Sequence, residues 1–321
     1  MSDPQDPLAG LDLGGDAPRL RSKRFAGGVA TLVADATGLD ADGRAALEQR
    51  LKAAGLAVRQ VQEVRVALTA QQPQRRIVAV ASGKGGVGKS TVSANLAIAL
   101  ARSGRRVGLI DADVYGPSQP TLLGSDARPE AEGDRLIPVP AHGLSFLSLG
   151  QLVSPGHALA WRGPMATGAL AKLLDADWGD TEYLVIDLPP GTGDVQLSLI
   201  QKSRPDGALI VSTPQDLSLI DATRAVDLFG KMHVPVLGLI ENMAGYACPH
   251  CGERSDPFGS GGAEAEATRL GIPFLGRLPL SSAIRAASDA GTPPAAGDGP
   301  DADAFAALAA KLLVALDTQP S

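Results

Sequence analysis

One stretch of nine residues constrains the fold of this chain more than any other. It reads Gly-Lys-Gly-Gly-Val-Gly-Lys-Ser-Thr from Gly83 to Thr91, after an apolar run at 77–81 and before an amphipathic pattern that continues to Leu100. A strand, a glycine-rich turn and a helix in this order predict a phosphate-binding loop, because glycines let backbone N–H groups wrap phosphate oxygens at a helix N-terminus. The alternative, a glycine-rich turn that binds nothing, is disfavoured because the full G-x-x-x-x-G-K-[ST] pattern is present in that context.

The residues of this loop have separate predicted roles. Lys89 is expected to reach the β- and γ-phosphates of a nucleotide, and Ser90 is expected to offer its hydroxyl to Mg²⁺. The other predicted nucleotide contacts come from Gly83, Lys84, Gly85, Gly86, Val87, Gly88 and Thr91. The stretch therefore predicts a nucleotide site with a magnesium ion beside it.

Lys84 is an unusual residue for such a loop. The pattern Lys-Gly-Gly-x-x-Gly-Lys-Ser/Thr resembles the deviant Walker A class of MinD, ParA and the nitrogenase iron protein. In that class the extra lysine crosses a dimer interface to the nucleotide of the partner subunit. The resemblance implies a homodimer closed around ATP, with Lys84 acting on the partner's nucleotide. The alternative interpretation is a solvated loop lysine.

The composition favours a globular α/β protein and excludes several other classes. Of 321 residues, 44% are hydrophobic and only 3% aromatic, and the net charge of −6 argues against a nucleic-acid-binding surface. No apolar run reaches the roughly 18 residues of a transmembrane helix, and residues 1–15 are acidic and lack the apolar region of a signal peptide. We expect a cytoplasmic protein that binds neither nucleic acid nor membrane.

The chain is predicted to contain four segments. These are a mobile tail at 1–24, a small α+β domain at 25–70, a linker at 71–75 and a P-loop ATPase domain at 76–321. Strand and helix patterns alternate through the last segment, which predicts a mainly parallel sheet flanked by helices. The N-terminal piece is too small to be comfortable alone, so we expect it to dock on the main domain or on a partner.

Carboxylates follow two of the predicted strands. A strand at 106–110 leads into Asp111 and Asp113, and a strand at 183–186 ends in Asp187. The carboxyl ends of parallel strands form the crevice where open α/β sheets bind ligands. Asp111 or Asp113 could hold Mg²⁺ through water or position the water that attacks the γ-phosphate, and Asp187 fits the Walker B carboxylate. For the first pair, the alternative is a strand end that caps the next turn.

Two further features lie late in the chain. Asn242 follows a strand at 236–240, and its amide could pair with an adenine edge. Cys248 and Cys251 lie three residues apart in a loop, where two thiolates can share one metal ion or one edge of a cluster. A thioredoxin-like disulfide is disfavoured because the pair does not open a helix. Two copies on a two-fold axis would supply four thiolates for a [4Fe–4S] cluster or a structural Zn²⁺, and the spacing does not choose between them.

Six motifs, in unbroken order from about Arg75 to about Leu280, resemble the Mrp/ApbC family of iron–sulfur cluster carrier ATPases. They read Gly-Lys-Gly-Gly-Val-Gly-Lys-Ser-Thr, Asp-Ala-Asp-Val-Tyr-Gly-Pro-Ser, Trp-Arg-Gly-Pro-Met, Asp-Leu-Pro-Pro-Gly-Thr-Gly-Asp, Ser-Thr-Pro-Gln-Asp, and Glu-Asn-Met followed by Cys-Pro-His-Cys-Gly. The resemblance implies that Asp113 orients the hydrolytic water and that Asn242 contacts adenine. It also implies that Cys248 and Cys251 bridge a labile [4Fe–4S] cluster between subunits.

The leading hypothesis is a cytoplasmic homodimeric ATPase that passes a cluster to apo iron–sulfur proteins. The six motifs imply the catalytic residues Lys84, Lys89 and Asp113, and Asp187 as the Walker B carboxylate. Residues 29–69 also resemble a shortened form of the small N-terminal domain of bacterial members. One rival is a ParA/MinD-like positioning protein, which would need a basic C-terminal helix, whereas the helix expected at 304–316 carries only Lys311 as a cation. The other rival is an ATPase scaffold with a structural zinc at the cysteines.

Overall fold

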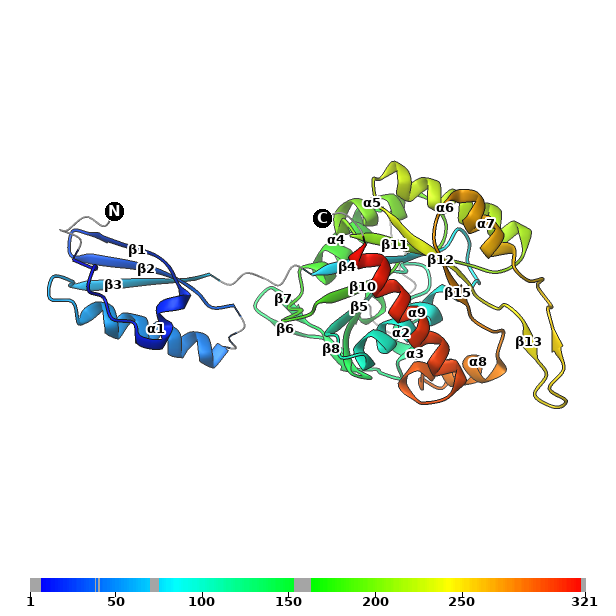
Figure 1. Cartoon of the computed structure of the whole chain (residues 1–321), viewed down its shortest axis with the longest axis horizontal. Helices are drawn as coiled ribbons and strands as arrows, with labels where there is room; N and C mark the ends of the chain where they lie inside the picture. Colours follow the sequence, from blue (N-terminus) through cyan, green and yellow to red (C-terminus); the bar gives the residue numbers. More distant parts are fainter. Residues whose placement is uncertain (1–6, 38, 40, 70–74, 153–162, 319–321) are drawn as a thin grey trace. The chain divides into compact units, whose positions relative to one another are not determined.

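The chain forms two compact units that divide between Gln74 and Arg75 (Figure 1). The computed structural model describes residues 7–37, 39, 41–69, 75–152 and 163–318. Most of the predicted linker at 71–75 lies outside these residues, as do the first two residues of the Trp-Arg-Gly-Pro-Met motif, at 161–162. Each unit is therefore described by itself.

The N-terminal unit is a three-stranded sheet with one helix. Its elements are the 3-10 helix η1 (Gly14–Arg19), β1 (Leu20–Ala26), β2 (Val29–Asp35), α1 (Ala41–Leu56) and β3 (Glu63–Thr69). β1 pairs antiparallel with β2, and β2 pairs parallel with β3. Ala30, Leu32 and Ala34 of β2 are buried in one cluster with Leu47 and Leu51 of α1. This alternation gives the unit its own hydrophobic core.

The structure differs here from the mobile tail predicted at 1–24. Residues 14–19 form η1, and residues 20–24 form most of β1. β1 is an edge strand, and its positions 21–24 are all exposed. Because no alternation of apolar and polar residues is needed at exposed positions of an edge, the segment carries no strand pattern in its sequence.

The C-terminal unit is an α/β fold around one large sheet (Figure 1). Its strands are β4 (Arg76–Ala81), β5 (Val107–Asp111), β6 (Glu130–Glu132), β7 (Arg135–Ile137), β8 (Val139–Ala141), β9 (Leu144–Ser148), β10 (Tyr183–Asp187), β11 (Gly207–Ser212), β12 (Val236–Glu241), β13 (Tyr246–Ala247), β14 (Arg254–Ser255) and β15 (Phe274–Arg277). Its helices are α2 (Lys89–Arg102), α3 (Gln119–Leu122), η2 (Leu149–Leu152), α4 (Gly163–Leu174), α5 (Asp194–Ser203), α6 (Asp216–Lys231), α7 (Gly262–Leu270), α8 (Ser282–Asp289), η3 (Pro294–Ala296) and α9 (Pro300–Asp317).

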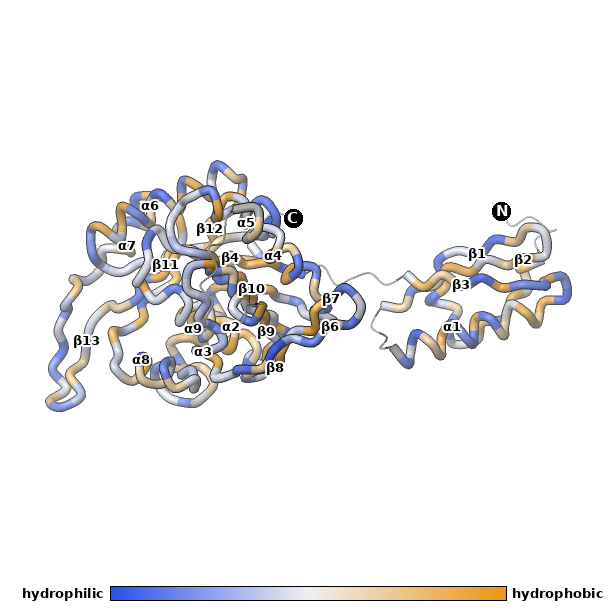
Figure 2. The backbone as a smooth tube through the Cα atoms, turned by 180° about the vertical axis from the view of Figure 1, so that it is seen from behind, coloured by the Kyte–Doolittle hydropathy of each residue, from blue (hydrophilic) through white to orange (hydrophobic). Residues whose placement is uncertain are grey.

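The large sheet has the strand order β15-β12-β11-β4-β10-β5-β9-β8, and every neighbouring pair is parallel except β8 with β9. Helices cover both faces: α2 and α9 contribute to one buried cluster, and α4, α5, α6 and α7 contribute to the other. The central strands are continuous apolar runs because they are buried on both faces, and hydrophobic segments gather at the centre of this unit in Figure 2. The predicted mainly parallel sheet is confirmed.

This topology gathers the predicted site residues at one edge of the sheet. β4, in the middle, leads into the glycine-rich loop, and the parallel strands β5, β10 and β12 end at the same edge in Asp111, Asp187 and Glu241. Ligands bind at this edge in open parallel sheets. Of the helices that the structure describes, none is both long and apolar enough to cross a membrane.

Candidate functional site

The glycine-rich loop joins β4 to α2 and takes the shape of a phosphate cradle. Gly86 and Gly88 have φ angles of 80° and 78°, in the left-handed region that glycine adopts without strain. Gly83 is required for a different reason, because a Cβ there would lie 2.0 Å from the backbone oxygen of Asp221 on α6. The loop thus ends on the N-terminus of α2, which favours negative charge.

Lys89, at the first position of α2, is buried, with 5% of its surface exposed. Its Nζ lies 2.6 Å from Oδ1 of Asp187 and 3.9 Å from Oδ2 of Asp113. Asp187 is fully buried, and it also accepts hydrogen bonds from Ser93 Oγ at 3.0 Å and from Gln119 Nε2 at 3.0 Å. The structure therefore brings together Lys89 and the predicted Walker B carboxylate as a buried ion pair with its hydrogen bonds satisfied.

Asp111 and Asp113 have different surroundings although they are two residues apart. Asp111 is fully buried, and both its oxygens accept protein hydrogen bonds, from Ser148 Oγ at 2.9 Å and from the N–H groups of Gln119 at 3.0 Å and Asp113 at 3.2 Å. Burial, with the nearby charge of Asp187, raises the pKa of Asp111 to about 7. Asp113 accepts the N–H groups of Tyr115 and Gly116 on Oδ1 and lines the hollow above the loop.

The charges of this group are unbalanced in favour of a cation. Two carboxylates, of Asp113 and Asp187, lie within 4 Å of the single ammonium of Lys89, and a third, of Asp111, lies close enough to Asp187 for the charge of Asp187 to raise its pKa. Over the part of the chain that the structure describes, no three carboxylate, histidine or cysteine side chains form a ready-made metal site. A bound Mg²⁺ would therefore need oxygens from the nucleotide beside Ser90, as is usual for this ion.

Gln119 is a central residue of this site that the sequence analysis did not single out. It is fully buried, and its Nε2 donates to the backbone oxygen of Ser90 at 3.1 Å as well as to Asp187. It thereby joins the start of α2 to the end of β10. A glutamine in a four-residue helix has no pattern that would reveal this long-range contact.

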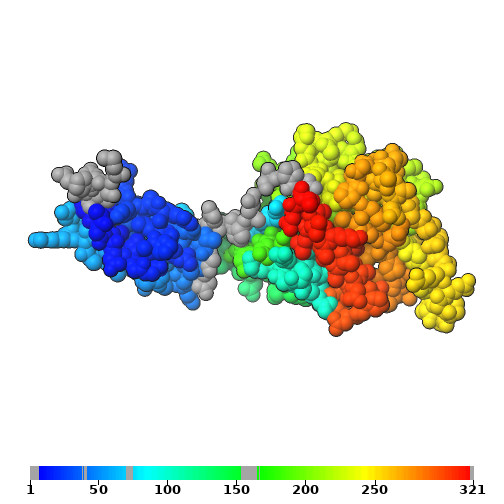
Figure 3. All heavy atoms as spheres, in the orientation of Figure 1, coloured from blue at the N-terminus to red at the C-terminus, as the bar shows by residue number. Residues whose placement is uncertain are grey.

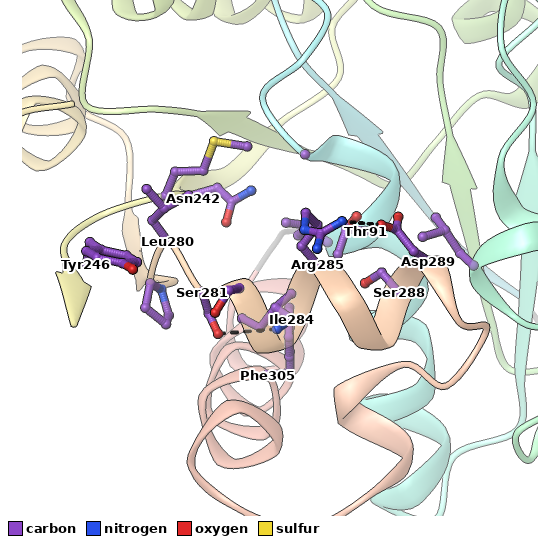
Figure 4. Close-up of a pocket in the computed structure, with 16 residues that line it drawn as sticks. Thr91, Asn242, Tyr246, Leu280, Ser281, Ile284, Arg285, Ser288, Asp289 and Phe305 are labelled. Carbon is purple, nitrogen blue, oxygen red and sulfur yellow. Dashed lines mark hydrogen bonds and ion pairs between the residues drawn. The ribbon is translucent and has the colours of Figure 1, made fainter. Parts of the chain in front are cut away.

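Two hollows meet over the loop. One, of about 260 Å³, is lined by the glycine-rich loop with Lys84, Lys89, Asp113 and Pro190. The other, of about 460 Å³, lies between the end of β12 and α8 (Figure 4). Gly88, Thr91 and Leu122 line both, so the two hollows are contiguous. Together they suit a ligand with an anionic end and a larger, mostly apolar end.

The larger cavity combines an apolar wall with a few polar groups. Leu280, Ile284 and Phe305 contribute apolar surface. Asn242 lies at its edge, where Nδ2 donates to the backbone oxygen of Val87 at 2.8 Å. The hydroxyl of Ser288 is buried in the wall and has no hydrogen-bond partner among the described residues. A buried, unpaired hydroxyl is costly, so that of Ser288 is available to a ligand in the cavity.

Lys84 lines the smaller hollow and is half-buried. Its backbone oxygen accepts the hydroxyl of Ser82 at 2.9 Å. Within the described ranges its ammonium forms no ion pair. The described chain thus leaves this charge without an ion-pair partner beside the smaller hollow.

Cys248 and Cys251 lie in a hairpin formed by β13 and β14, which projects from the body of the C-terminal unit (Figures 1 and 3). Both thiols are free; Cys248 is half-buried and Cys251 is exposed. Hydrogen bonds from the N–H groups of Cys251 and His250, with the Cys251 thiol, lower the pKa of Cys248, which favours the metal-binding thiolate. In the described chain no third ligand joins the pair, so a four-ligand centre needs a second donor set.

Comparison with known families decides which class of P-loop protein this is. The family model described as ParA, NUBPL iron-transfer P-loop NTPase, matches residues 74–313. The chain belongs to the NUBPL iron-transfer P-loop NTPase family. The match covers the whole C-terminal unit up to the last turn of α9, including the loop, the carboxylates and the cysteine hairpin. The predicted P-loop ATPase is confirmed by this membership.

Relatives in this NTPase family carry names that agree with the predicted resemblance. The chain is 50% identical over 228 residues to an iron–sulfur cluster carrier protein of Pseudomonas fragi, covering 70% of this chain and 79% of that protein. It is 49% identical over 222 residues to the iron–sulfur cluster carrier protein of Escherichia coli K12, covering 68% of this chain and 60% of that protein. The resemblance to iron–sulfur cluster carrier ATPases is confirmed.

Solved structures support the NTPase fold. A nucleotide-binding protein from Archaeoglobus fulgidus, in complex with ADP, matches with a TM-score of 0.62 and 39% identity over 70% of this chain and 89% of that chain. The cell division ATPase MinD of Pyrococcus furiosus matches with a TM-score of 0.60 and 23% identity over 75% of this chain and 99% of that chain. At that identity, the likeness to MinD concerns the fold alone.

Proposed function

We propose that this protein is a homodimeric, ATP-hydrolysing carrier that binds a [4Fe–4S] cluster between two copies of Cys248 and Cys251 and passes it to apo iron–sulfur proteins. The observation that carries the proposal is the free thiol pair on a projecting hairpin, in a chain whose glycine-rich loop and strand-end carboxylates lie together. The exposed thiol of Cys251 suits transfer, because an acceptor thiolate can reach a cargo that it holds. We place this activity in the cytoplasm.

The nucleotide is proposed to occupy both hollows. Its phosphates would take the N–H groups of the loop and the ammonium of Lys89, which would leave Asp187. Its base would enter the larger cavity, where the amide of Asn242 and the hydroxyl of Ser288 supply hydrogen bonds. This exchange explains why Lys89 and Asp187 are paired in the protein alone.

For hydrolysis, each residue of the site has a proposed task. Asp113 would accept a hydrogen bond from the attacking water and so orient it, since Asp113 lines the hollow and its Oδ2 lies 3.9 Å from Lys89 Nζ. Mg²⁺ would be held by Ser90, Asp111 and Asp187. When bound, this ion supplies positive charge to the β- and γ-phosphate oxygens. Lys84 of one subunit would add a second positive charge to the partner's nucleotide, which explains an ammonium without an ion-pair partner in the described chain.

The cluster would be held by four thiolates, two from each subunit, because one chain offers only two. A zinc scaffold has the same ligand set, so metal content decides between them. A ParA/MinD-like positioning role is less well supported, because α9 carries only Lys311 as a cation and its Nζ donates to the backbone oxygen of Leu275 at 2.7 Å.

Metal content tests the proposal. The full chain is reconstituted without oxygen, and iron, acid-labile sulfide, zinc and native mass are measured for the wild type, Cys248→Ala and Cys251→Ala. We expect about four iron and four sulfide per two chains in the wild type and loss of both in each variant. Zinc alone, or iron that is unaffected by either substitution, would overturn the carrier proposal.

A further inference from the structure

The cysteine hairpin begins in the wall of the larger cavity. Tyr246, the first residue of β13, lines this cavity and is two residues from Cys248 (Figure 4). It lies across the cavity mouth from the α8 side, to which Ile284 and Arg285 belong. One side chain is therefore part of both the proposed nucleotide site and the element that carries the thiols.

The root of the hairpin contacts the segment that precedes α8. The N–H of Ala244 donates to the oxygen of Leu278 at 2.9 Å, and the N–H of Leu280 donates to the oxygen of Gly245 at 2.8 Å. Tyr246 forms a parallel bridge with Leu280. These bonds join the start of the hairpin to the segment that leads into α8, which is the opposite wall of the cavity.

The loop between β12 and α7 is also held at both ends. The contacts come from Glu241, the last residue of β12, and from Asn242, which follows it. Asn242 donates to Val87 of the glycine-rich loop. Glu241 is fully buried and accepts the N–H of Ala263, at the start of α7, at 2.8 Å. The two ends of the cysteine-bearing loop are thus tied to the nucleotide side of the sheet.

The middle of the loop has no comparable support. From Ala247 to Ser260 the residues are exposed except Cys248 and Phe258, which are half-buried. Among the described residues, the strand pairing of this part is that of β13 with β14 alone. The direction in which the thiols point is therefore set at the root, where Tyr246 lies.

We propose that Tyr246 is a positioning residue for the cysteine pair, through which nucleotide in the cavity holds the hairpin in one orientation. The inference rests on the proposed nucleotide site and names the route by which occupancy of that site reaches the cargo site. A base that fills the cavity contacts the tyrosine ring, because the flat face of a base can stack on an aromatic side chain. A hairpin that is restrained at its root keeps the half-buried thiol of Cys248 in its place, so a reagent in solution reaches that thiol less often.

The test measures thiol reactivity in the reduced, cluster-free full chain. The rate of alkylation of Cys248 and Cys251 by N-ethylmaleimide is followed by mass spectrometry, without nucleotide and with saturating ADP. We expect ADP to slow alkylation of Cys248 in the wild type about fivefold or more, the size of a typical coupling between two sites. The ratio of the alkylation rate without ADP to the rate with ADP is then compared between variants. Tyr246→Phe, which keeps the ring, is expected to retain this ratio, and Tyr246→Ala is expected to bring it to one.

Ile284→Ala is the matched control, because Ile284 lines the same cavity from α8 and is not part of the hairpin. It is expected to weaken ADP binding and to keep the ratio once ADP saturates, as judged by calorimetry on each variant. Unchanged or faster alkylation of the wild type with ADP would overturn the proposal, and so would a ratio that persists in Tyr246→Ala. Because no cluster is present, this outcome is independent of the iron and sulfide measurement.

Discussion

At the level of single residues, the polar groups of the site differ in how far the protein itself satisfies their charges and hydrogen bonds. Lys89 is paired with Asp187, the oxygens of Asp111 accept protein donors, and the hydroxyl of Ser288 has no partner within the described chain. These groups respond differently to protons and to nucleotide. Two of them, Asp111 and Ser288, give predictions for the substitution of a single side chain.

Asp111 predicts a pH-dependent contribution to stability in the nucleotide-free protein. Its pKa is raised from an ordinary value of 3.8 to about 7, so between these pH values the folded state binds more protons than the unfolded state. The contribution of Asp111 to the free energy of unfolding therefore falls as pH rises through this window. We expect the free energy of unfolding of Asp111→Asn, relative to that of the wild type, to be higher at pH 8 than at pH 4, as measured by urea unfolding. Equal differences at both pH values would contradict this, and Asp126→Asn, at an exposed position, is the control.

Ser288 predicts opposite effects on stability and on binding. Removal of a buried hydroxyl that lacks a partner is expected to leave the nucleotide-free protein as stable as the wild type or more stable. If the nucleotide pairs with that hydroxyl, Ser288→Ala weakens ADP binding by about 1 kcal/mol, or about fivefold. Calorimetry and thermal unfolding measure the two effects. Ser260→Ala, at an exposed position that does not line the cavity, is expected to change neither, and equal ADP affinity in Ser288→Ala would contradict the assigned role.

At the scale of elements, Glu241 connects β12, α7 and β15. Its carboxylate accepts Nε of Arg277 at 2.9 Å as well as the N–H of Ala263. Arg277 also pairs with Glu264 at 2.5 Å, where both side chains are about half exposed. The same arginine thus has one buried and one exposed carboxylate partner, which allows a matched comparison.

We expect Glu241→Gln to lower the free energy of unfolding by about 1–3 kcal/mol, because the charge-assisted bonds of a buried carboxylate are lost. Glu264→Gln removes the charge of the exposed carboxylate that pairs with the same arginine. It is expected to lower the free energy of unfolding by at most about 1 kcal/mol. Urea unfolding of both variants measures the difference. Equal losses would show that burial at the end of β12 does not strengthen the interaction.

The elements also show what sequence can and cannot predict. The glycine-rich loop, the strand-ending carboxylates and the cysteine pair were predicted because each depends on neighbours in sequence. Gln119, Glu241 and Tyr246 were missed because their roles arise from contacts between strands and loops that lie far apart in the chain. β1 was missed because an exposed edge strand shows no apolar alternation.

At the scale of the whole molecule, the chain is divided into units with separate cores. The N-terminal core and the two clusters of the C-terminal unit share no residues. The two hollows over the glycine-rich loop and the hairpin lie in the C-terminal unit. The two units are therefore expected to be separable in folding and in nucleotide binding.

We expect a fragment of residues 75–321 to fold and to bind ADP within about threefold of the full chain, because every residue that lines the hollows belongs to this unit. Circular dichroism and calorimetry provide the measurement. Loss of nucleotide binding in a folded fragment would show that the N-terminal unit contributes to the site.

The proposed function is that the protein carries a cluster and delivers it. The most direct measurement is activation of an apo [4Fe–4S] enzyme by the cluster-loaded protein, without oxygen and with an iron chelator that captures released iron. We predict activation that survives the chelator and is absent when Cys248→Ala replaces the wild type. Activation that the chelator abolishes would mean that iron is released to solution, and this would contradict the account.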